Sequence, residues 1–523
     1  MKTLLIFPTP VSVMPYGILY IADVFRRKQF KTRLLVNTFK IPYSHDEFIK
    51  IVKEEQPDVV CLSFATLNLI SIYKLIDGIK KAIPAIVICG GPHPSSRPDE
   101  VIEYKSDIVV KGEGELITES LCDLFTDIHN KRGYIKINDK ELIDGLKKIN
   151  GICFRDVTGN IYHTSPQERN SNLDKLSVPD LEMLDKNAFR AIDGTLKGFN
   201  RIENGRGCPN YCTFCDRSVF GNKYVSKSPE RLIQDILFLK EQYGFTDFYF
   251  TDDTFTIKPD YVLDVCDKIL QNKLDITWAC ATRVNTVKLK LLQKMKAAGC
   301  RRVIMGIESG DNDWLKRTRK GYTNDVAIKA LNIAHEAKIE THVNLMYGYP
   351  WETTEHIENQ IRFVAYVKHM VDIFQTYGAL IPYPNTEAFD ANKDEYNLDK
   401  WWLKEKYQKC GQVIYQNAIN PYAVSTFYQR NLHDDTYVYE DYFFKFSEDY
   451  KKSVRRLGFL LGRHNLKAQY EQSYVQNGYY YLGVLSRNLY EYLPNLEKKF
   501  MKNIGLKNRL HEYRKIGEFI KRN

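Results

Sequence analysis

Three cysteines lie close together near the middle of the chain, in the run CPNYCTFC. Cys208, Cys212 and Cys215 fall at offsets of four and three, whereas the next cysteines along the chain, Cys153 and Cys266, are distant. Thiolates are soft ligands that suit iron–sulfur clusters, zinc or Cu(I), and a short loop lets three of them converge. A four-iron cluster with three protein ligands would keep one iron open for another molecule. The alternatives are a zinc site completed by a distant residue and three unrelated core cysteines.

This spacing, with aromatic Phe214 directly before the last cysteine, resembles the signature of the radical S-adenosylmethionine (SAM) superfamily. The resemblance implies a [4Fe–4S] cluster on the three cysteines, with SAM chelating the open iron through its amino and carboxylate groups. Reduction of such a cluster cleaves SAM to a 5′-deoxyadenosyl radical. The cofactors then carry the difficult chemistry, while the protein binds and orients them and excludes water.

The composition is that of an ordinary globular protein. The 523 residues are 44% hydrophobic and 27% charged, which leaves room for two or three domains. No apolar run approaches the roughly 18 residues of a membrane span, and the start MKTLLIFPTP is too short and proline-broken for a signal peptide. Eleven cysteines, scattered except for one group, indicate a reducing compartment, so we expect a cytoplasmic protein. The net charge of +10 is interpreted as solvated surface, which makes a nucleic-acid partner the less favoured alternative.

The first 127 residues are predicted to form a doubly wound parallel sheet of the flavodoxin or Rossmann type. Apolar runs such as LLIFPT, TRLLVN, DVVCLSFAT and AIVICGG alternate with predicted helices over 18–28, 47–55, 70–81 and 116–125. Strands that are apolar on both faces belong to parallel sheets covered by helices on both sides. Ligands of such sheets bind at the carboxyl ends of the strands, where glycine lets the backbone approach closely.

The turns at these strand ends, together with the helix start PYGILYIA, resemble the cobalamin-binding (B12-binding) domain that precedes many radical SAM cores. The resemblance makes cobalamin the probable third cofactor. The alternative is a domain that has kept the fold and lost the ligand. The residues implied in cobalamin binding are Pro8, Thr9, Gly17, Ser63, Thr66, Gly90, Gly91, His93, Gly112, Glu113, Gly114 and Glu115.

The lower face of the cobalt is expected to carry no imidazole. The chain lacks the Asp-x-His-x-x-Gly sequence by which other cobalamin proteins supply a histidine to cobalt. Of the histidines before the cluster loop, only His93 in GGPHPS is placed to touch the cofactor. By resemblance, we predict that His93 hydrogen-bonds the nucleotide tail of cobalamin and does not ligate the metal.

Residues 128–195 are predicted to be a connector with a β-hairpin that packs between domains. Residues 196–395 repeat strand then helix six times, with helices expected over 229–243, 258–271, 288–298, 323–338 and 353–369. Such alternation predicts a barrel or an open part of one. The radical SAM core is similar: a partial (β/α)6 barrel with the cluster loop after the first strand.

Carried over position by position, the resemblance implies a set of SAM-binding residues on the cluster side. Thr251, Asp252 and Asp253 stand where other members place a Gly-Gly-Glu stretch that contacts the SAM amino group. Arg283 is implied as the partner of the SAM carboxylate, because its fixed fork suits that group. Phe214 completes this set.

The ends of the fourth and fifth barrel strands are implied in binding the nucleoside of SAM. Glu308 and Ser309 match the positions that hold the ribose hydroxyls. Tyr347, Gly348 and Pro350 resemble the stretch that lies along the adenine. No residue is assigned as an acid or base toward the substrate.

Residues 396–523 are rich in aromatic and basic residues and are predicted to form a mainly helical region that closes the barrel and selects the substrate. The leading hypothesis is a cobalamin-dependent methyltransferase acting on an unactivated carbon or phosphorus of a small-molecule or lipid-like substrate. It would need an external one-electron reductant such as flavodoxin or ferredoxin. The alternatives are a cyclase or rearrangement enzyme, a tRNA methylthiotransferase-like enzyme and a non-catalytic cobalamin-binding protein. A methylthiotransferase would need a second cluster, whereas Cys61, Cys89 and Cys122 are predicted to be core residues.

Overall fold

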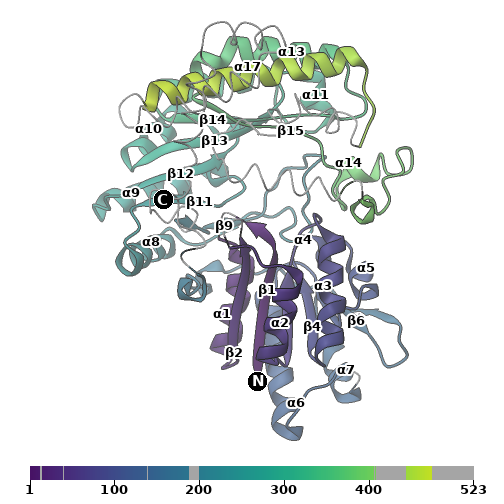
Figure 1. Ribbon diagram of the computed structural model, residues 1–523. Coiled ribbons are helices and arrows are strands. Elements are labelled where there is room, and N and C mark those ends of the chain that lie inside the picture. Colours follow the sequence, from purple (N-terminus) through teal and green to yellow (C-terminus); the bar gives the residue numbers. More distant parts are fainter. Residues whose placement is uncertain are drawn as a thin grey trace, which may run out of the picture.

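The computed structural model describes residues 1–407, apart from 12–13, 39–40, 138, 186, 188–199 and 406, and residues 443–473. Two sheets, one below the other in Figure 1, form the centres of two α/β domains. The predicted fold class is confirmed in both. Among the described helices, none is long and apolar enough to cross a membrane.

The first sheet has five parallel strands in the order β2-β1-β3-β4-β5, which is the flavodoxin order. Its strands are buried on both faces, as their apolar sequences predict. The strands are β1 (Lys2–Val11), β2 (Lys31–Thr38), β3 (Val59–Ser63), β4 (Ile86–Gly90) and β5 (Ile108–Val110). The helices of this domain are α1 (Tyr16–Arg27), α2 (His45–Glu55), α3 (Leu69–Ala82), α4 (Pro92–Ser96), α5 (Pro98–Glu103), α6 (Glu115–Arg132) and α7 (Lys140–Leu146).

Local sequence signals set several helix ends. α2 begins at a capping box in which the Ser44 side chain accepts from the Glu47 backbone and the Glu47 side chain accepts from the Ser44 backbone. The first helix of the second domain, α8 (Pro229–Tyr243), follows the N-cap Ser228 and ends at Gly244, whose φ of 69° is left-handed. Such caps satisfy backbone groups that a helix cannot pair internally.

The predicted hairpin forms, but it extends the first sheet rather than packing between the domains. β6 (Ile152–Arg155) pairs antiparallel with β5, and β7 (Ile161–His163) pairs antiparallel with β6. Its turn is held by Asp156, whose Oδ1 accepts from two backbone amides of the turn. The sheet therefore has seven strands, with the hairpin at one edge.

The second sheet has six parallel strands in consecutive order, so it is the predicted partial barrel. The strands are β8 (Arg201–Ile202), β11 (Asp247–Phe250), β12 (Thr277–Thr282), β13 (Cys300–Glu308), β14 (Glu340–Tyr347) and β15 (Ile373–Ala379). Between them lie α8, α9 (Pro259–Gln271), α10 (Leu289–Ala297), α11 (Asn312–Arg317), α12 (Asn324–Glu336) and α13 (Thr354–Val367).

The C-terminal region contributes a long helix, α17 (Glu448–Ser473), as its predicted helical character requires. In Figure 1 this yellow helix runs along α13 and β15. Its Asn465 side chain pairs with both backbone groups of Phe374, at 2.9 and 3.0 Å. The helix thus satisfies groups on the edge strand that no neighbouring strand pairs. Residues 408–442 and 474–523 of the predicted C-terminal region lie outside the described residues.

Candidate active site

The cluster loop, residues 207–224, is bracketed by a small antiparallel ribbon of β9 (Gly205–Arg206) and β10 (Val225–Ser226). On it, Cys212 is buried, Cys208 is half-buried and Cys215 is exposed. The three sulfur atoms do not all lie within 4.8 Å of one another. Thiolates on one zinc ion, with bonds of about 2.3 Å, could not be more than about 4.6 Å apart. The loop therefore fits a multi-iron cluster better than a single ion.

Two side chains point hydrogen-bond donors at these sulfur atoms. Asn210 Nδ2 lies 3.1 Å from Cys208 Sγ, and Arg283 Nη1 lies 3.5 Å from Cys212 Sγ. Donors of this kind stabilise thiolates and tune the potential of a bound cluster. Both donors therefore face cysteines that the spacing predicts as cluster ligands.

Arg283 and Lys320 place two buried cations beside Cys212. Arg283 follows β12 directly, and its Nη2 donates to the Lys320 carbonyl. The Lys320 Nζ lies 5.7 Å from the centre of the Phe214 ring, in a cation–π contact. The buried Nε of Arg283 has no hydrogen-bond partner, and a buried donor of this kind calls for an acceptor. This corner therefore fits the SAM carboxylate. Lys320 is a candidate SAM-binding residue that was not predicted from the sequence.

Glu308 lies in the same corner in a strained conformation. Its φ of 68° is left-handed, at a bulge where β13 leaves its register with β14. A Cβ on Gly306 would meet the Glu308 carboxylate at 2.5 Å, so a side chain at this position would displace the carboxylate. Burial raises the pKa of Glu308, while Lys320 Nζ at 3.5 Å lowers it. Glu308 is thus held beside Arg283 and Lys320. This position is compatible with its predicted role of binding a ribose hydroxyl.

The end of β11 offers one carboxylate with an open oxygen. Asp252 Oδ1 accepts from Asn204 Nδ2 at 2.9 Å and from the Tyr224 hydroxyl at 2.7 Å, but its buried Oδ2 has no hydrogen-bond partner. Burial raises the pKa of Asp252 to about 7. An N–H donor such as the SAM amino group would satisfy this oxygen, so Asp252 fits the predicted role. Thr251 instead donates to the backbone of β8, and Asp253 is exposed.

Ser309 and Tyr347 do not fit their predicted roles toward SAM. The buried Ser309 hydroxyl donates to Gln360 Oε1 and accepts from the Asp311 amide, both at 3.1 Å, so its only proton is already used. Tyr347 points into the core between the sheet and its helices. Pro350 remains half-buried on the turn after β14. The sequence pattern predicts where these strands end, but not the direction in which each side chain points.

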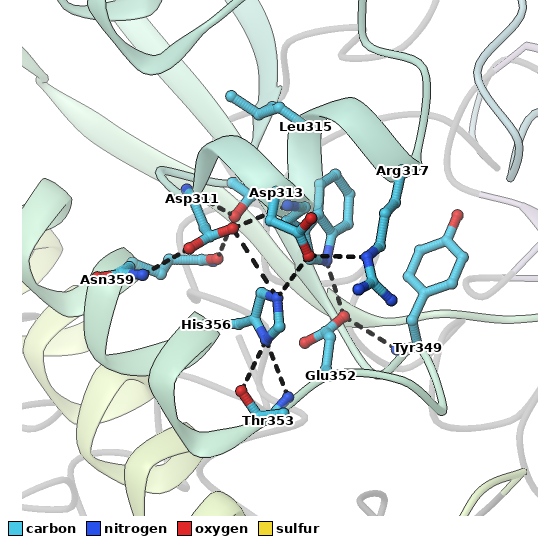
Figure 2. Close-up of polar contacts among 12 residues, drawn as sticks. Asp311, Asp313, Leu315, Arg317, Tyr349, Glu352, Thr353, His356 and Asn359 are labelled. Atoms are coloured by element: carbon cyan, nitrogen blue, oxygen red, sulfur yellow. Dashed lines mark hydrogen bonds and ion pairs between the residues drawn. The ribbon is translucent and has the colours of Figure 1, made fainter.

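A buried glutamate holds the turn after β14. Glu352 Oε1 accepts from the Tyr349 amide at 2.9 Å and from the Trp314 indole at 2.8 Å, as Figure 2 shows. Its Oε2 accepts from the Tyr450 hydroxyl at 2.8 Å. Gly348, with a left-handed φ of 97°, donates its amide to the same hydroxyl. Tyr450 is distant in sequence, so no local motif could have identified it.

A histidine joins the turns after β13 and β14. His356 Nδ1 accepts from the Thr353 amide at 3.0 Å, so Nε2 carries the proton and donates to Asp313 Oδ2 at 3.1 Å. Figure 2 shows this imidazole between the N-terminus of α13 and the aspartates of the turn and helix α11. The contacts fix the two loops that carry the predicted nucleoside-binding residues.

In the first domain, the turn after β4 is built for close approach. Gly91 has a φ of 100°, and a Cβ there would meet the Phe64 carbonyl at 3.0 Å and the Ser63 hydroxyl at 3.1 Å. Gly90, just before it, has ordinary clearance. The turn therefore presses against the end of β3 and exposes backbone at the sheet edge.

The other turns of this edge contain small residues and one hydroxyl group without a hydrogen-bond partner. Thr9 Oγ1 is buried without a hydrogen-bond partner, next to Pro8. A Cβ on Gly17 would meet nothing within 4 Å, and Gly112 has a left-handed φ of 81°. A Cβ on Gly114 would crowd a side chain of α1 at 2.9 Å. An open hydroxyl and small residues at a strand-end edge fit a large ligand such as cobalamin.

His93 does not have the predicted role toward cobalamin. It is fully buried, with Nδ1 3.2 Å from Thr66 Oγ1 and Nε2 3.2 Å from both the Tyr73 hydroxyl and Glu100 Oε1. Burial lowers the pKa of His93. The Trp402 indole donates to the same Glu100 at 3.0 Å. Through Glu100 this network reaches Trp402 in the segment after the barrel, and both ring nitrogens of His93 already have partners within the first domain.

Glu113 and Glu115 form an interdomain ion cluster instead of a ligand site. The Arg206 guanidinium, 2% exposed, donates to Glu113 at 3.0 Å, to Glu115 at 2.7 Å and to Glu203 at 2.8 Å. Arg169 Nε donates to the other oxygen of Glu113 at 3.1 Å. We call these five residues the Arg206 clamp. It fixes the start of the cluster loop to the end of β5.

Comparisons with known proteins agree with this architecture. Residues 3–121 match the B12 binding domain family, and residues 202–364 match the Radical SAM superfamily. The chain is 29% identical to an uncharacterized methyltransferase, PH0819, of Pyrococcus horikoshii, over 75% of this chain and 83% of that protein. It is 22% identical to the anaerobic magnesium-protoporphyrin IX monomethyl ester cyclase of Rubrivivax gelatinosus, over 78% and 70% of the two chains.

The fold also matches a solved structure. The radical SAM methyltransferase TsrM of Kitasatospora setae, determined with cobalamin and a [4Fe–4S] cluster bound, aligns with a TM-score of 0.62 at 18% identity. The alignment covers 76% of this chain and 78% of TsrM. These matches identify an enzyme that carries a B12-binding domain followed by a radical SAM domain, in the predicted order.

Proposed function

We propose that this enzyme is a cobalamin-dependent radical SAM methyltransferase that acts on an unactivated carbon or phosphorus of a small-molecule or lipid-like substrate. The observation that carries the proposal is the contact between the cluster loop and the carboxyl edge of the first sheet. Ser218 Oγ donates to the Pro92 carbonyl at 3.2 Å, and a Cβ on Gly112 would lie 3.5 Å from the Val219 carbonyl. The candidate cobalamin edge and the cluster loop therefore lie against each other.

The chain's own residues bind and orient the cofactors. When bound, the cluster and SAM supply a radical that removes a hydrogen atom, and cobalamin supplies the methyl group. Arg283 and Lys320 would hold the SAM carboxylate, Asp252 would accept from its amino group, and Glu308 would bind a ribose hydroxyl. Burial of these side chains excludes water and strengthens each ionic contact.

Methyl transfer is favoured because the P. horikoshii relative, which this chain matches over most of its length, is described as a methyltransferase. Ring formation is the second candidate, supported by the more distant match to the R. gelatinosus cyclase. We further propose an external one-electron reductant such as flavodoxin or ferredoxin, and a cytoplasmic location.

A methylthiotransferase-like function is disfavoured by the cysteines of the first domain. Cys61 and Cys89 are buried and belong to separate apolar clusters, and Cys122 lies buried on α6. They therefore do not face a common site that could hold a second cluster. Iron near four per chain in the reconstituted protein would agree with a single cluster, whereas about eight would contradict it.

The test is SAM turnover by the anaerobically purified protein after its cluster has been rebuilt. We expect 5′-deoxyadenosine together with S-adenosylhomocysteine when substrate is present, and no 5′-deoxyadenosine from Cys212→Ala. Deoxyadenosine without S-adenosylhomocysteine would favour cyclisation or rearrangement. Failure of the wild type to cleave SAM under strong reduction would favour a non-catalytic cobalamin-binding protein.

A further inference from the structure

Three potential metal ligands meet at the hairpin edge of the first sheet. Cys153 on β6 and His163 on β7 are paired directly across the hairpin, so their side chains lie on one face. Asp99 of α5 completes the group. His163 Nε2 is 2.7 Å from Asp99 Oδ1 and 3.8 Å from Cys153 Sγ, and the sulfur is 3.9 Å from Oδ1. In the part of the chain that the structure describes, no other three His, Cys, Asp or Glu donor atoms lie within 4.8 Å of one another.

The arrangement differs from a catalytic Cys–His–Asp triad. In a triad the imidazole uses one nitrogen for the nucleophile and the other for the carboxylate. Here Nε2 of His163 faces both partners, so the three donor atoms surround one point. Burial is the main cause that raises the pKa of the Cys153 thiol to about 12, and the negative charge of Asp99 adds to it. Without a cation the thiol is protonated and a poor nucleophile.

We propose that Asp99, Cys153 and His163 bind one zinc ion, with water as the fourth ligand. One thiolate, one imidazole and one carboxylate are a donor set that zinc accepts in tetrahedral geometry. Zinc bond lengths place such donors roughly 3.3–3.6 Å apart. When zinc binds, the two distances from Cys153 Sγ to its partners would shorten by about 0.3 Å. The distance between His163 Nε2 and Asp99 Oδ1 would widen by about 0.6 Å.

Access and charge also fit an ion. The side chains of Asp99 and His163 are 60% and 41% exposed, whereas Cys153 is buried, so an ion can enter from solvent and bind sulfur on the inner side. A thiolate and a carboxylate neutralise a divalent cation. The ion would fix the hairpin to α5. Glu100, which follows Asp99 in this helix, accepts hydrogen bonds from the Tyr73 hydroxyl and the Trp402 indole. The site would therefore link the hairpin to α5 on elements separate from the cluster loop.

The test measures zinc in the holoenzyme, whose rebuilt cluster occupies the three loop cysteines. After incubation with zinc and gel filtration, we expect about one zinc per chain in the wild type. Cys153→Ser and His163→Ala should each bind zinc at least about tenfold more weakly. Cys122→Ser, at a buried cysteine of the same domain, is the matched control and should keep the zinc. His163 is exposed, so His163→Ala decides the outcome if Cys153→Ser fails to fold.

X-ray absorption at the zinc edge identifies the ligands. We expect one sulfur at about 2.3 Å and nitrogen or oxygen neighbours at about 2.0–2.2 Å. A shell with several sulfurs would place the zinc on the cluster loop and overturn the proposal. No retained zinc, or equal zinc in the wild type and in His163→Ala, would overturn it as well.

Discussion

The strand ends of the two sheets carry similar polar residues but use them differently. At the second sheet, Arg283 and Asp252 each keep a buried polar atom without a hydrogen-bond partner. At the first sheet, Glu113, Glu115 and His93 are fully engaged in contacts that join parts of the protein. The carboxyl edge of a parallel sheet thus locates a binding region. Whether a given side chain there binds a ligand or holds two domains together depends on what packs against it.

The largest effect is expected from breaking the Arg206 clamp. Arg206→Met removes the cation that three buried carboxylates share, of which only Glu113 keeps a second one in Arg169, and this should lower the free energy of unfolding by about 3–5 kcal/mol. Its guanidinium also lies over the rings of Tyr20 and Phe220, so Arg206→Lys should recover only part of the loss. Denaturant unfolding and iron content measure both effects.

The control for this prediction is Arg301→Met. Arg301 pairs with Asp247 at the surface, where both side chains are more than half exposed. Such pairs contribute between about 0 and 1 kcal/mol. Equal losses from Arg206→Met and Arg301→Met would show that the buried clamp does not join the two domains.

Asp252 should give the second sheet a pH dependence. Its pKa in the folded protein is about 7, above its usual value, so the folded state binds the proton more tightly than the unfolded state. Stability contributed by this proton is present at low pH and is lost as pH rises from about 4 to about 7. Relative to wild type, Asp252→Asn should gain on the order of 2–4 kcal/mol across that window.

The same carboxyl links pH to cofactor binding. If Asp252 accepts a hydrogen bond from the SAM amino group, affinity for SAM should rise up to about pH 7 and then level off, because only the ionised carboxylate offers both oxygens as acceptors. Asp252→Asn should remove this dependence. Titration calorimetry from pH 5 to 8 would detect it, and an unchanged profile in the variant would exclude Asp252 from the site.

A smaller effect on binding is expected from Arg283→Met. Loss of charged hydrogen bonds to the SAM carboxylate should weaken SAM affinity by about 1.5–3 kcal/mol, or roughly tenfold to a hundredfold. Glu113→Gln, at the other sheet edge, should leave SAM affinity within about twofold of wild type. If Glu113→Gln weakened SAM binding as much as Arg283→Met, the proposed division between the two edges would be wrong.

His93→Ala provides the smallest test. It leaves Glu100 and Tyr73 with fewer partners and should reduce stability by about 1–2 kcal/mol without reducing cobalamin binding. Bound Co(II) cobalamin should show an electron paramagnetic resonance spectrum without nitrogen superhyperfine splitting from a protein ligand. Splitting that disappears in His93→Ala would show that this imidazole ligates cobalt after all.

Much of this architecture could be predicted from sequence because it rests on local patterns. Apolar strands and helical periods gave both parallel sheets, and the cysteine spacing located the cluster loop. Lys320 could not be predicted, since its contact with Glu308 depends on how the chain after α11 folds back. Likewise, Tyr450 meets Glu352 only because α17 packs on α13, a contact between segments far apart in sequence.

His93 and Ser309 show the opposite case. Their positions match the pattern, but Thr66, Glu100 and Gln360 already occupy their polar atoms. Partners of this kind come from other elements and leave no trace in the motif itself.

The central claim is that the cobalamin edge and the cluster loop form one composite site. The most direct test is spin relaxation of bound Co(II) cobalamin, measured by pulsed electron paramagnetic resonance with the cluster reduced and oxidised. We predict faster cobalt relaxation when the cluster is reduced, because a second paramagnet then lies nearby, and no such change in Cys212→Ala. Cobalt relaxation that is the same whether the cluster is reduced, oxidised or absent would contradict a shared site.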